Sequence, residues 1–492
     1  MTAPPGPVRA GLADGAWHRV HPLTPLVRSW QFIAVVGFFL VQDAGQRWIG
    51  SPGFGGPSVP PTSLPSRDTG LRVWLAGGGV LLLALAALVG LAVLSWRMTR
   101  YRVTSDALEL HRGVLFRQHR LAQLDRLQAV DVVQPLLARI FGLARLSLEV
   151  AGSGSSKIEL AYVTDAQARE LRNHLLAGAA GLRYETDQAP EAPEQHWLEV
   201  PVGRLVASIL LSSSTATLLV TTLGFIVASL ALGTMAPAAG VLPALIGIGG
   251  VLWARFSHGF GFRVATSPDG LRLRHGLLEQ RTQTVPPGRV QAVRLSQPLL
   301  WRRAGWWRVQ VNVAGYGTGG DASKGESETV LLPVGTRDEA VAVLAFVAPD
   351  LGVGADEHPR LVVDAGLDGT GAAQGFVTSP RQARWFDWIS WRRNGFRVTD
   401  QALLVRHGVI ERSLVLVPHA RTQSLGVTQG PVQRRLGLAS FALHSTPGPI
   451  SPTVAHLSEP VAAHLLATQA ERARLARAGA GPEQWMRPEA SR

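Results

Sequence analysis

Four apolar runs stand out along the chain, and more polar segments separate them. The strongest is residues 71–96, where about 24 residues in succession carry no charge, enough to cross the roughly 30 Å hydrocarbon core of a bilayer. Leu205 to Leu232 and Gly240 to Phe256 form a second apolar pair around a short turn, and Leu26 to Gln42 is a weaker run ahead of the strongest one. The pattern predicts four transmembrane helices in two hairpins.

The weakest of these runs also fits a signal peptide. The stretch before it is long and rich in Pro and Gly, and the sequence VQDAGQ after it is a poor cleavage site, so we expect a retained helix. Arginines gather on one side of the predicted spans: Arg9, Arg19, Arg28, Arg97, Arg100, Arg102, Arg204 and Arg255. Because positive residues favour the cytoplasmic side, we expect a multi-pass protein of the cell membrane with both termini and all its β-domains inside.

The segments between and after these runs repeat one pattern of residues. A glycine stands 13 residues before an arginine, which stands 8 residues before a glutamine, in three copies: Gly113, Arg126 and Gln134; Gly276, Arg289 and Gln297; Gly408, Arg421 and Gln429. Apolar and polar residues alternate around each glycine, which predicts a β-hairpin. A short helical turn, another strand pair and a closing helix follow in each copy. Each unit suits a small curled sheet that buries one face under its C-terminal helix.

The third copy has no apolar hairpin in front of it. A linker rich in Gly, Ala and Asp leads instead to the sequence RQARWFDWISWRRN. Indole rings favour the headgroup zone and arginines meet anionic lipid, so we expect a helix at the inner leaflet. Its expected membrane-interface residues are Trp385, Trp388, Trp391, Arg392 and Arg393. The alternative is that these aromatic side chains pack on the third β-domain.

These patterns predict an α+β membrane protein with four transmembrane helices in two hairpins and three β-domains, each capped by a C-terminal helix. The expected segments are an N-terminal cytoplasmic segment (1–25), a transmembrane hairpin with an outer loop (26–96), a first β-domain (97–180), a linker (181–203), a second transmembrane hairpin (204–257), a second β-domain (258–350), a flexible linker (351–380), the interfacial helix (381–394), a third β-domain (395–478) and a tail (479–492).

The R-x-Q and Q-P-x-x-x-R-x-x-G patterns after a transmembrane hairpin resemble the bacterial pleckstrin-homology (PH) domain of YdbS/YdbT-like membrane proteins. The resemblance covers most of the chain. It implies a seven-stranded PH-like fold with a C-terminal helix, no catalytic residues, and a shorter companion protein with one hairpin and one such domain. The third copy departs most, because Gly430 and Pro431 replace the Gln-Pro order of Gln134 and Pro135.

Composition and charge narrow the classes of function. Hydrophobic residues make up 46% of the chain and charged residues 17%, which fits several segments in lipid better than an ordinary soluble enzyme. The net charge of +13 rests on arginine, since only two of the 48 basic residues are lysine. Because basic residues gather beside the predicted spans, no nucleic-acid partner is needed to explain them. The chain has no cysteine, which excludes disulfides and thiolate chemistry.

Sequence motifs of catalysis are missing as well. No His-Glu-x-x-His or Gly-x-Ser-x-Gly occurs, and the fourteen histidines are scattered. We therefore expect a protein that is not an enzyme and has no cofactor or metal site. A membrane enzyme would need polar groups that converge with catalytic spacing at the inner interface.

The repeated arginines Arg126, Arg289 and Arg421 are the candidate ligand-binding residues, because a guanidinium offers a planar fork of donors to a phosphate or a lipid headgroup. The favoured alternative is that they maintain the fold. For the whole chain we expect a scaffold whose partners are membrane lipid and a second PH-like membrane protein or another copy of itself, joined through exposed strand edges. The alternative function is an envelope-stress or antimicrobial-peptide protection factor that acts through the membrane or by export.

Overall fold

The computed structural model describes most of the three β-domains and the second apolar hairpin. The described residues are 15–25, 87, 90–104, 107–113, 117–150, 157–179, 194–234, 238–267, 270–314, 329–446 and 448–479. The first predicted span, most of the second, the loop between them and nearly all of the C-terminal tail lie outside these residues.

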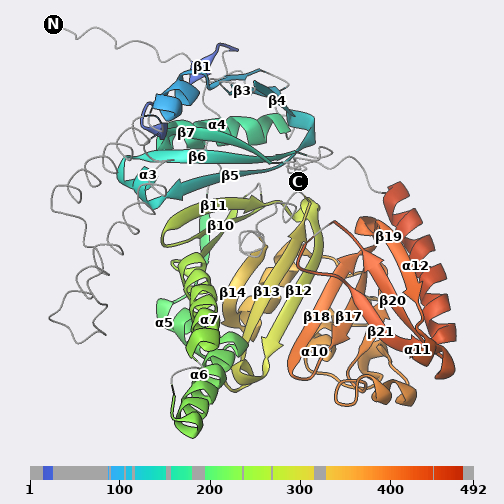
Figure 1. The fold of residues 1–492 in the computed structure, drawn as a ribbon. Coiled ribbons are helices and arrows are strands. Elements are labelled where there is room, and N and C mark those ends of the chain that lie inside the picture. Colours follow the sequence, from blue (N-terminus) through green and yellow to red (C-terminus); the bar gives the residue numbers. More distant parts are fainter. Residues whose placement is uncertain are drawn as a thin grey trace, which may run out of the picture.

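The second apolar pair forms a helical hairpin. The short helix α5 (Val202–Leu210) leads into α6 (Ser213–Leu232), and α7 (Ala238–Gly259) packs back against α6 (Figure 1). The Ser212 side chain caps α6 by accepting a backbone N–H of its first turn, and Gly233 ends the helix in a left-handed conformation. Among the described residues, α6 is the helix with the length and apolarity of a membrane span. That α6 and the other three expected helices cross a membrane stays a prediction.

The first β-domain contains seven strands and a closing helix. Its strands β1 to β4 form one antiparallel sheet, and β5 to β7 belong to another. Leu171 and Leu175 of the closing helix are buried in the core that both sets of strands line. The elements are β1 (His18–Arg19), β2 (Arg100–Val103), β3 (Ala107–Arg112), β4 (Gln118–Gln123), η1 (Leu124–Arg126), β5 (Leu127–Pro135), α3 (Leu136–Ile140), β6 (Leu143–Val150), β7 (Lys157–Thr164) and α4 (Asp165–Ala179).

The second β-domain repeats this order around the apolar hairpin, which is inserted after its first strand. Its closing helix begins with a capping box, in which Thr336 and Glu339 bond to each other's backbone N–H groups. The elements are β8 (Gln195–Glu199), then the hairpin, β9 (Arg263–Ser267), β10 (Gly270–His275), β11 (Glu279–Val285), η2 (Pro287–Arg289), β12 (Val290–Pro298), η3 (Leu299–Ala304), β13 (Trp306–Val313), β14 (Val330–Thr336) and α9 (Arg337–Val347).

The third β-domain has the same seven-strand order and the longest closing helix. Its first strand follows a helix that the other two domains do not show in their described residues. The elements are α10 (Pro359–Leu367), η4 (Ala373–Gly375), β15 (Val377–Thr378), η5 (Arg381–Trp385), β16 (Gly395–Val398), β17 (Ala402–His407), β18 (Glu411–Pro418), η6 (His419–Arg421), β19 (Ser424–Thr428), α11 (Pro431–Arg435), β20 (Leu438–His444), β21 (Thr453–Ser458) and α12 (Glu459–Gly479).

The sheets run across the boundaries between domains. One seven-stranded sheet has the order β7-β6-β5-β11-β10-β9-β8, so it joins the last three strands of the first domain to the first four of the second. The other has the order β14-β13-β12-β18-β17-β16-β15 and joins the second domain to the third in the same way. Figure 1 shows β5 beside β11 and β12 beside β18. The three domains therefore form one head-to-tail array.

The segment expected as a flexible linker, 351–380, is folded instead. Its helix α10 packs against β17 and β18, with Val362, Val363 and Leu367 buried. Strand β15 pairs with β16 and so supplies the first strand of the third domain. The composition of the segment concealed this fold, because α10 is short and its apolar face becomes stable only when it packs on a sheet.

The helix expected at 381–394 is also not continuous. Only Arg381–Trp385 forms a short 3-10 helix, and turns follow. Arg393 is 2% exposed and donates to the backbone oxygens of Gly366, Leu367 and Gly369, so it holds the end of α10 in place. The expectation that Arg393 faces lipid headgroups is therefore wrong. Backbone carbonyls at a helix end need donors, and a buried guanidinium can supply several.

A second buried arginine supports the same region and gives a test of the fold. Arg406 is 0% exposed and lies 4.3 Å from the ring centre of Phe376. Its guanidinium donates to the backbone oxygens of Arg393, Ala365 and Gly371. Burial lowers the pKa of Arg406 to about 10, which keeps the side chain charged at neutral pH.

We expect Arg406→Met to destabilise the third domain by about 3 kcal/mol, because three backbone carbonyls lose a charged donor while the volume is roughly kept. Thermal unfolding of the full chain in detergent, followed by tryptophan fluorescence, should show its midpoint fall by about 10 °C. Arg474→Met is the matched control, since the Arg474 side chain is 67% exposed. Equal midpoints for the two variants would contradict the structural role of Arg406.

Candidate functional site

The two junctions between domains have one and the same strand register. At the first junction, β5 pairs with β11 and Pro135 lies opposite Glu279. At the second junction, β12 pairs with β18 and Pro298 lies opposite Glu411. Both glutamates stand three residues after the turn glycine of their copy. The junction is therefore a repeated interface of the fold.

A small side chain from each domain completes the core of the next one. Ala129 on β5 is 0% exposed and belongs to the apolar core of the second domain. Its counterpart Ala292 on β12 is also 0% exposed and belongs to the core of the third domain. Both alanines stand three residues after the repeated arginine. The junctions therefore bury apolar surface in addition to forming backbone hydrogen bonds.

Two of the three candidate ligand-binding arginines also cross these junctions. Arg289 is half-buried, and its Nη2 donates to the backbone oxygen of Leu127 in the first domain at 3.4 Å. Arg421 is half-buried as well and donates to the backbone oxygen of Gly288 in the second domain. Arg126 is exposed, and no hydrogen bond or ion pair joins it to the described residues. Binding of a ligand by these arginines stays a prediction.

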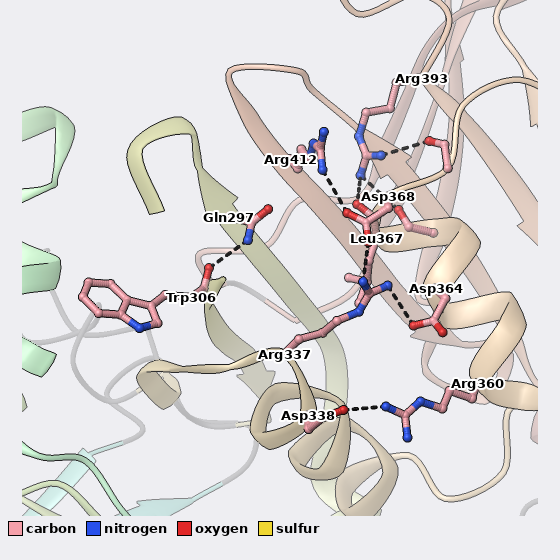
Figure 2. Close-up of polar contacts among 12 residues, drawn as sticks. Gln297, Trp306, Arg337, Asp338, Arg360, Asp364, Leu367, Asp368, Arg393 and Arg412 are labelled. Carbon is pink, nitrogen blue, oxygen red and sulfur yellow. Dashed lines mark hydrogen bonds and ion pairs between the residues drawn. The ribbon is translucent and has the colours of Figure 1, made fainter. Parts of the chain in front are cut away.

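The repeated glutamines act within their own domain. Gln297 donates to the backbone oxygen of Trp306 at 3.2 Å, which Figure 2 shows, and Gln429 donates to the backbone oxygen of Leu438 at 3.0 Å. Gln134 donates to the Asp165 carboxylate at the start of α4. In the second and third domains these contacts hold the two ends of the short helical turn together, and in the first domain the glutamine joins β5 to the start of the closing helix.

Ion pairs reinforce the second junction on the side of the closing helix. Figure 2 shows Arg337 of α9 between two carboxylates of the third domain, with Nη2 2.9 Å from Asp364 and Nη1 2.5 Å from Asp368. Asp368 also accepts from Arg412 of β18 at 2.9 Å. Because α10 carries or borders these carboxylates, the helix acts as a bridge between the two domains.

A polar hollow of about 340 Å³ lies beside the first junction. Its basic side chains include Arg169, which pairs with Asp165 at 2.9 Å, and Arg272, which pairs with Glu194 at 2.5 Å. The two pairs come from opposite sides of the junction, so the hollow is lined by groups that partly neutralise one another.

The apolar hairpin is attached to the second domain at both of its ends. Where α7 ends, three hydrogen bonds join it to the end of β10 and the turn after it. The His275 ring bonds to the backbone oxygen of His258 at 2.9 Å. The Gly276 N–H donates to the Phe260 oxygen and the Leu277 N–H to the Ser257 oxygen, each at 2.8 Å. Where α5 begins the hairpin, the buried Trp301 indole donates to the Ser208 oxygen at 3.0 Å. Arg204 also pairs with Glu339 at 2.6 Å.

Comparison with known proteins gives the family of this arrangement. The family described as "Bacterial PH domain" matches three times, at residues 57–179, 214–350 and 374–473. The chain belongs to the bacterial PH domain family. It is also similar to the UPF0699 transmembrane protein YdbT of Bacillus subtilis (strain 168), with 24% identity over 292 residues. That match covers 54% of this chain and 59% of the relative's length.

The resemblance seen in the sequence is thus confirmed, and the three PH domains fit a membrane-associated protein with a non-catalytic role. The described residues hold no group of three or more side chains placed to bind a metal ion. Strand edges of neighbouring PH domains pair with each other at the two junctions, β5 with β11 and β12 with β18.

The Trp and Arg segment before the third PH domain exposes most of the expected interfacial side chains. Trp385 is 73% exposed and Trp388 is 79% exposed. Trp391 is half-buried, and the guanidinium of Arg392 lies over its ring, 5.2 Å from the ring centre. Asn394, at the end of this segment, accepts from the Gly408 N–H at 3.1 Å. The segment therefore bonds to the turn that corresponds to the one held by α7 in the second domain. Contact of its tryptophans with lipid stays a prediction.

The buried histidine at the end of α7 gives a test of this attachment. Burial first, and then the nearby Arg281, lowers the pKa of His275 to about 4. The ring is therefore neutral when folded, whereas an unfolded histidine takes up its proton near pH 6.5. The unfolded chain binds more protons between these values, so stability is full above pH 6.5 and falls as the pH drops toward 4.

We expect this histidine to account for about 3 kcal/mol of acid destabilisation across that window. In His275→Gln, the slope of unfolding midpoint against pH between 6.5 and 4 should be smaller than in the unmodified chain. His464→Gln, at an exposed position of α12, should keep the original slope. An unchanged slope in His275→Gln would show that the ring is already protonated in the folded protein.

Proposed function

We propose that this chain is a non-enzymatic scaffold anchored in the membrane, which presents its PH domains at the inner leaflet and assembles with a smaller membrane protein of the same family. The observation that carries the proposal is the repeated junction. Two successive pairs of PH domains associate through the same strand edges in the same register.

Association of this kind needs no ligand pocket. Main-chain hydrogen bonds supply affinity when a strand is added to a sheet edge, and side chains at fixed positions supply specificity. The contact is also heterologous, because the edge that β5 offers differs from the edge that β11 offers. A heterologous contact does not close on itself, so the first and the third domain each keep one such edge that no other domain of the chain pairs among the described residues.

Anchoring in the membrane supports the same function. The α6 and α7 hairpin is apolar and its side chains are largely exposed, as with Leu219 at 65% and Leu230 at 78%. Arg204 and Arg255 stand at the domain end of the hairpin, which favours a cytoplasmic position for the PH domains. Confinement to one membrane would also raise the effective concentration of two anchored partners.

The test of the scaffold is purification of the intact chain from the membranes of the cells that make it. We expect a membrane protein that contains a PH domain to co-purify at a constant molar ratio. Quantitative mass spectrometry of the purified material gives the ratio and identifies bound lipids. Recovery of the chain with lipid alone would overturn the scaffold proposal.

We further propose that the exposed tryptophans before the third domain contact the inner leaflet. Because the chain has no cysteine, Trp388→Cys gives a single site for an environment-sensitive fluorophore. In nanodiscs with anionic lipid, quenchers attached to the lipids should quench the label at this site. A label at Leu475→Cys, whose native side chain is 56% exposed on α12, should stay accessible to aqueous quenchers. Equal aqueous quenching at both sites would contradict the membrane contact.

A further inference from the structure

The sheet edge at the start of the array is unoccupied among the described residues. Strands β1 to β4 form a four-stranded sheet with β4 at its edge. In the other two domains the corresponding four strands continue into three strands of the preceding domain. Strand β4 is thus the counterpart of β11 and β18, the two strands that accept a neighbour.

Side chains on β4 are exposed at positions that are buried in the junctions of the other two domains. Leu121, Thr284 and Leu416 stand at the same distance after their turn glycines. Thr284 and Leu416 are each 1% exposed, whereas Leu121 is 55% exposed. Leu121 is thus exposed at a position that lies in a domain junction, and is buried, in both other copies.

Other positions of the same edge show the same contrast. Gln118 is exposed, while its counterparts Arg281 and Ser413 are 6% and 2% exposed. Arg126 is exposed, while Arg289 and Arg421 reach backbone oxygens of the preceding domain. Residues that correspond to the junction residues of the other two domains are therefore exposed on β4 and the following turn, where a preceding domain would contact them.

The opposite end of the array is a poor match for this edge. Strand β19 is the counterpart of β5 and β12, but it has 5 residues where each of these has 9. Ser424 stands in place of Ala129 and Ala292 and is exposed. Gly430 also separates Gln429 from the proline. These changes disfavour a second copy of the chain as the occupant.

We infer that β4 is the docking edge for a PH domain of a separate membrane protein, which adds its β5-type strand antiparallel to β4 in the register of the two internal junctions. This inference rests on the proposed scaffold and names its contact surface. The incoming strand carries alanine three residues after its own arginine, as β5 and β12 do. Arg126 then donates to a backbone oxygen of the incoming domain.

The register of the internal junctions fixes which residues meet. Thr282 lies opposite Val132, and Leu414 lies opposite Leu295. Val132 and Leu295 both stand three residues before the proline that ends their strand. The counterpart of Thr282 on β4 is His119. His119 should therefore face the residue three positions before the corresponding proline of the partner.

The experiment places the photo-reactive residue p-benzoylphenylalanine at position 121 of the full chain and irradiates the membranes of cells that make it. We expect a cross-link to the β5-type strand of a second membrane protein with a PH domain, located by mass spectrometry of the joined peptides. The same residue at position 475, which lies on the exposed face of α12, should give no such product.

Point variants test the contact independently. Leu121→Asp should reduce recovery of the co-purifying PH protein at least tenfold, and Arg126→Ala should reduce it by a smaller factor. Leu475→Asp should leave recovery unchanged. Because Leu121 and Arg126 are exposed, the unfolding midpoint of each variant should match that of the unmodified chain.

The outcomes separate the docking edge from the scaffold as a whole. The PH protein could co-purify without a cross-link from position 121 and with unchanged recovery in Leu121→Asp. In that case the docking edge is wrong and the scaffold stands. A cross-link from position 121 to β19 of another copy would overturn the separate partner. If no PH protein co-purifies, both proposals fail.

Discussion

The structure depends on one constraint: the edge of a β-sheet carries unpaired backbone N–H and C=O groups that need partners. In this chain four such edges pair with one another across the domain boundaries, β5 with β11 and β12 with β18. The hydrophobic cores also extend across the domain boundaries, since Ala129 and Ala292 each lie in the core of the next domain. A change at a junction is therefore expected to affect the stability of both domains that meet there.

The residues kept in all three copies divide into three physical roles. The turn glycine is required by the backbone: Gly276 has φ +112°, and a Cβ there would lie 2.0 Å from the Glu279 oxygen. The glutamine ties together strands of its own domain, as Gln297 does with Trp306. The arginine reaches the preceding domain, as Arg289 does with Leu127. An internal repeat thus preserves the interface as well as the fold, which gives a structural reason for keeping an arginine at this position.

The sequence allows the repeat, its hairpins and its closing helices to be predicted, because glycine position and period-two alternation depend on local geometry. It does not reveal that the domains share sheets, since every residue offers the backbone groups that pair β5 with β11. The fold of 351–380 was missed because α10 is stable only on the sheet it covers. The expectation that Arg393 faces lipid is wrong, because an arginine beside tryptophans has the same sequence pattern at a membrane surface and next to buried carbonyls.

The continuous sheets also fix the position of the third domain, which has no apolar hairpin in front of it. The hairpin of the second domain is fixed to its sheet through Trp301 and the turn after His275. The second junction then fixes the third domain to that sheet, with Arg337, Asp364 and Asp368 as a further brace. The third domain is therefore held in the array by its neighbour and not by a hairpin of its own. The turn that receives α7 in the second domain still needs a partner for its backbone, and in the third domain Asn394 supplies it.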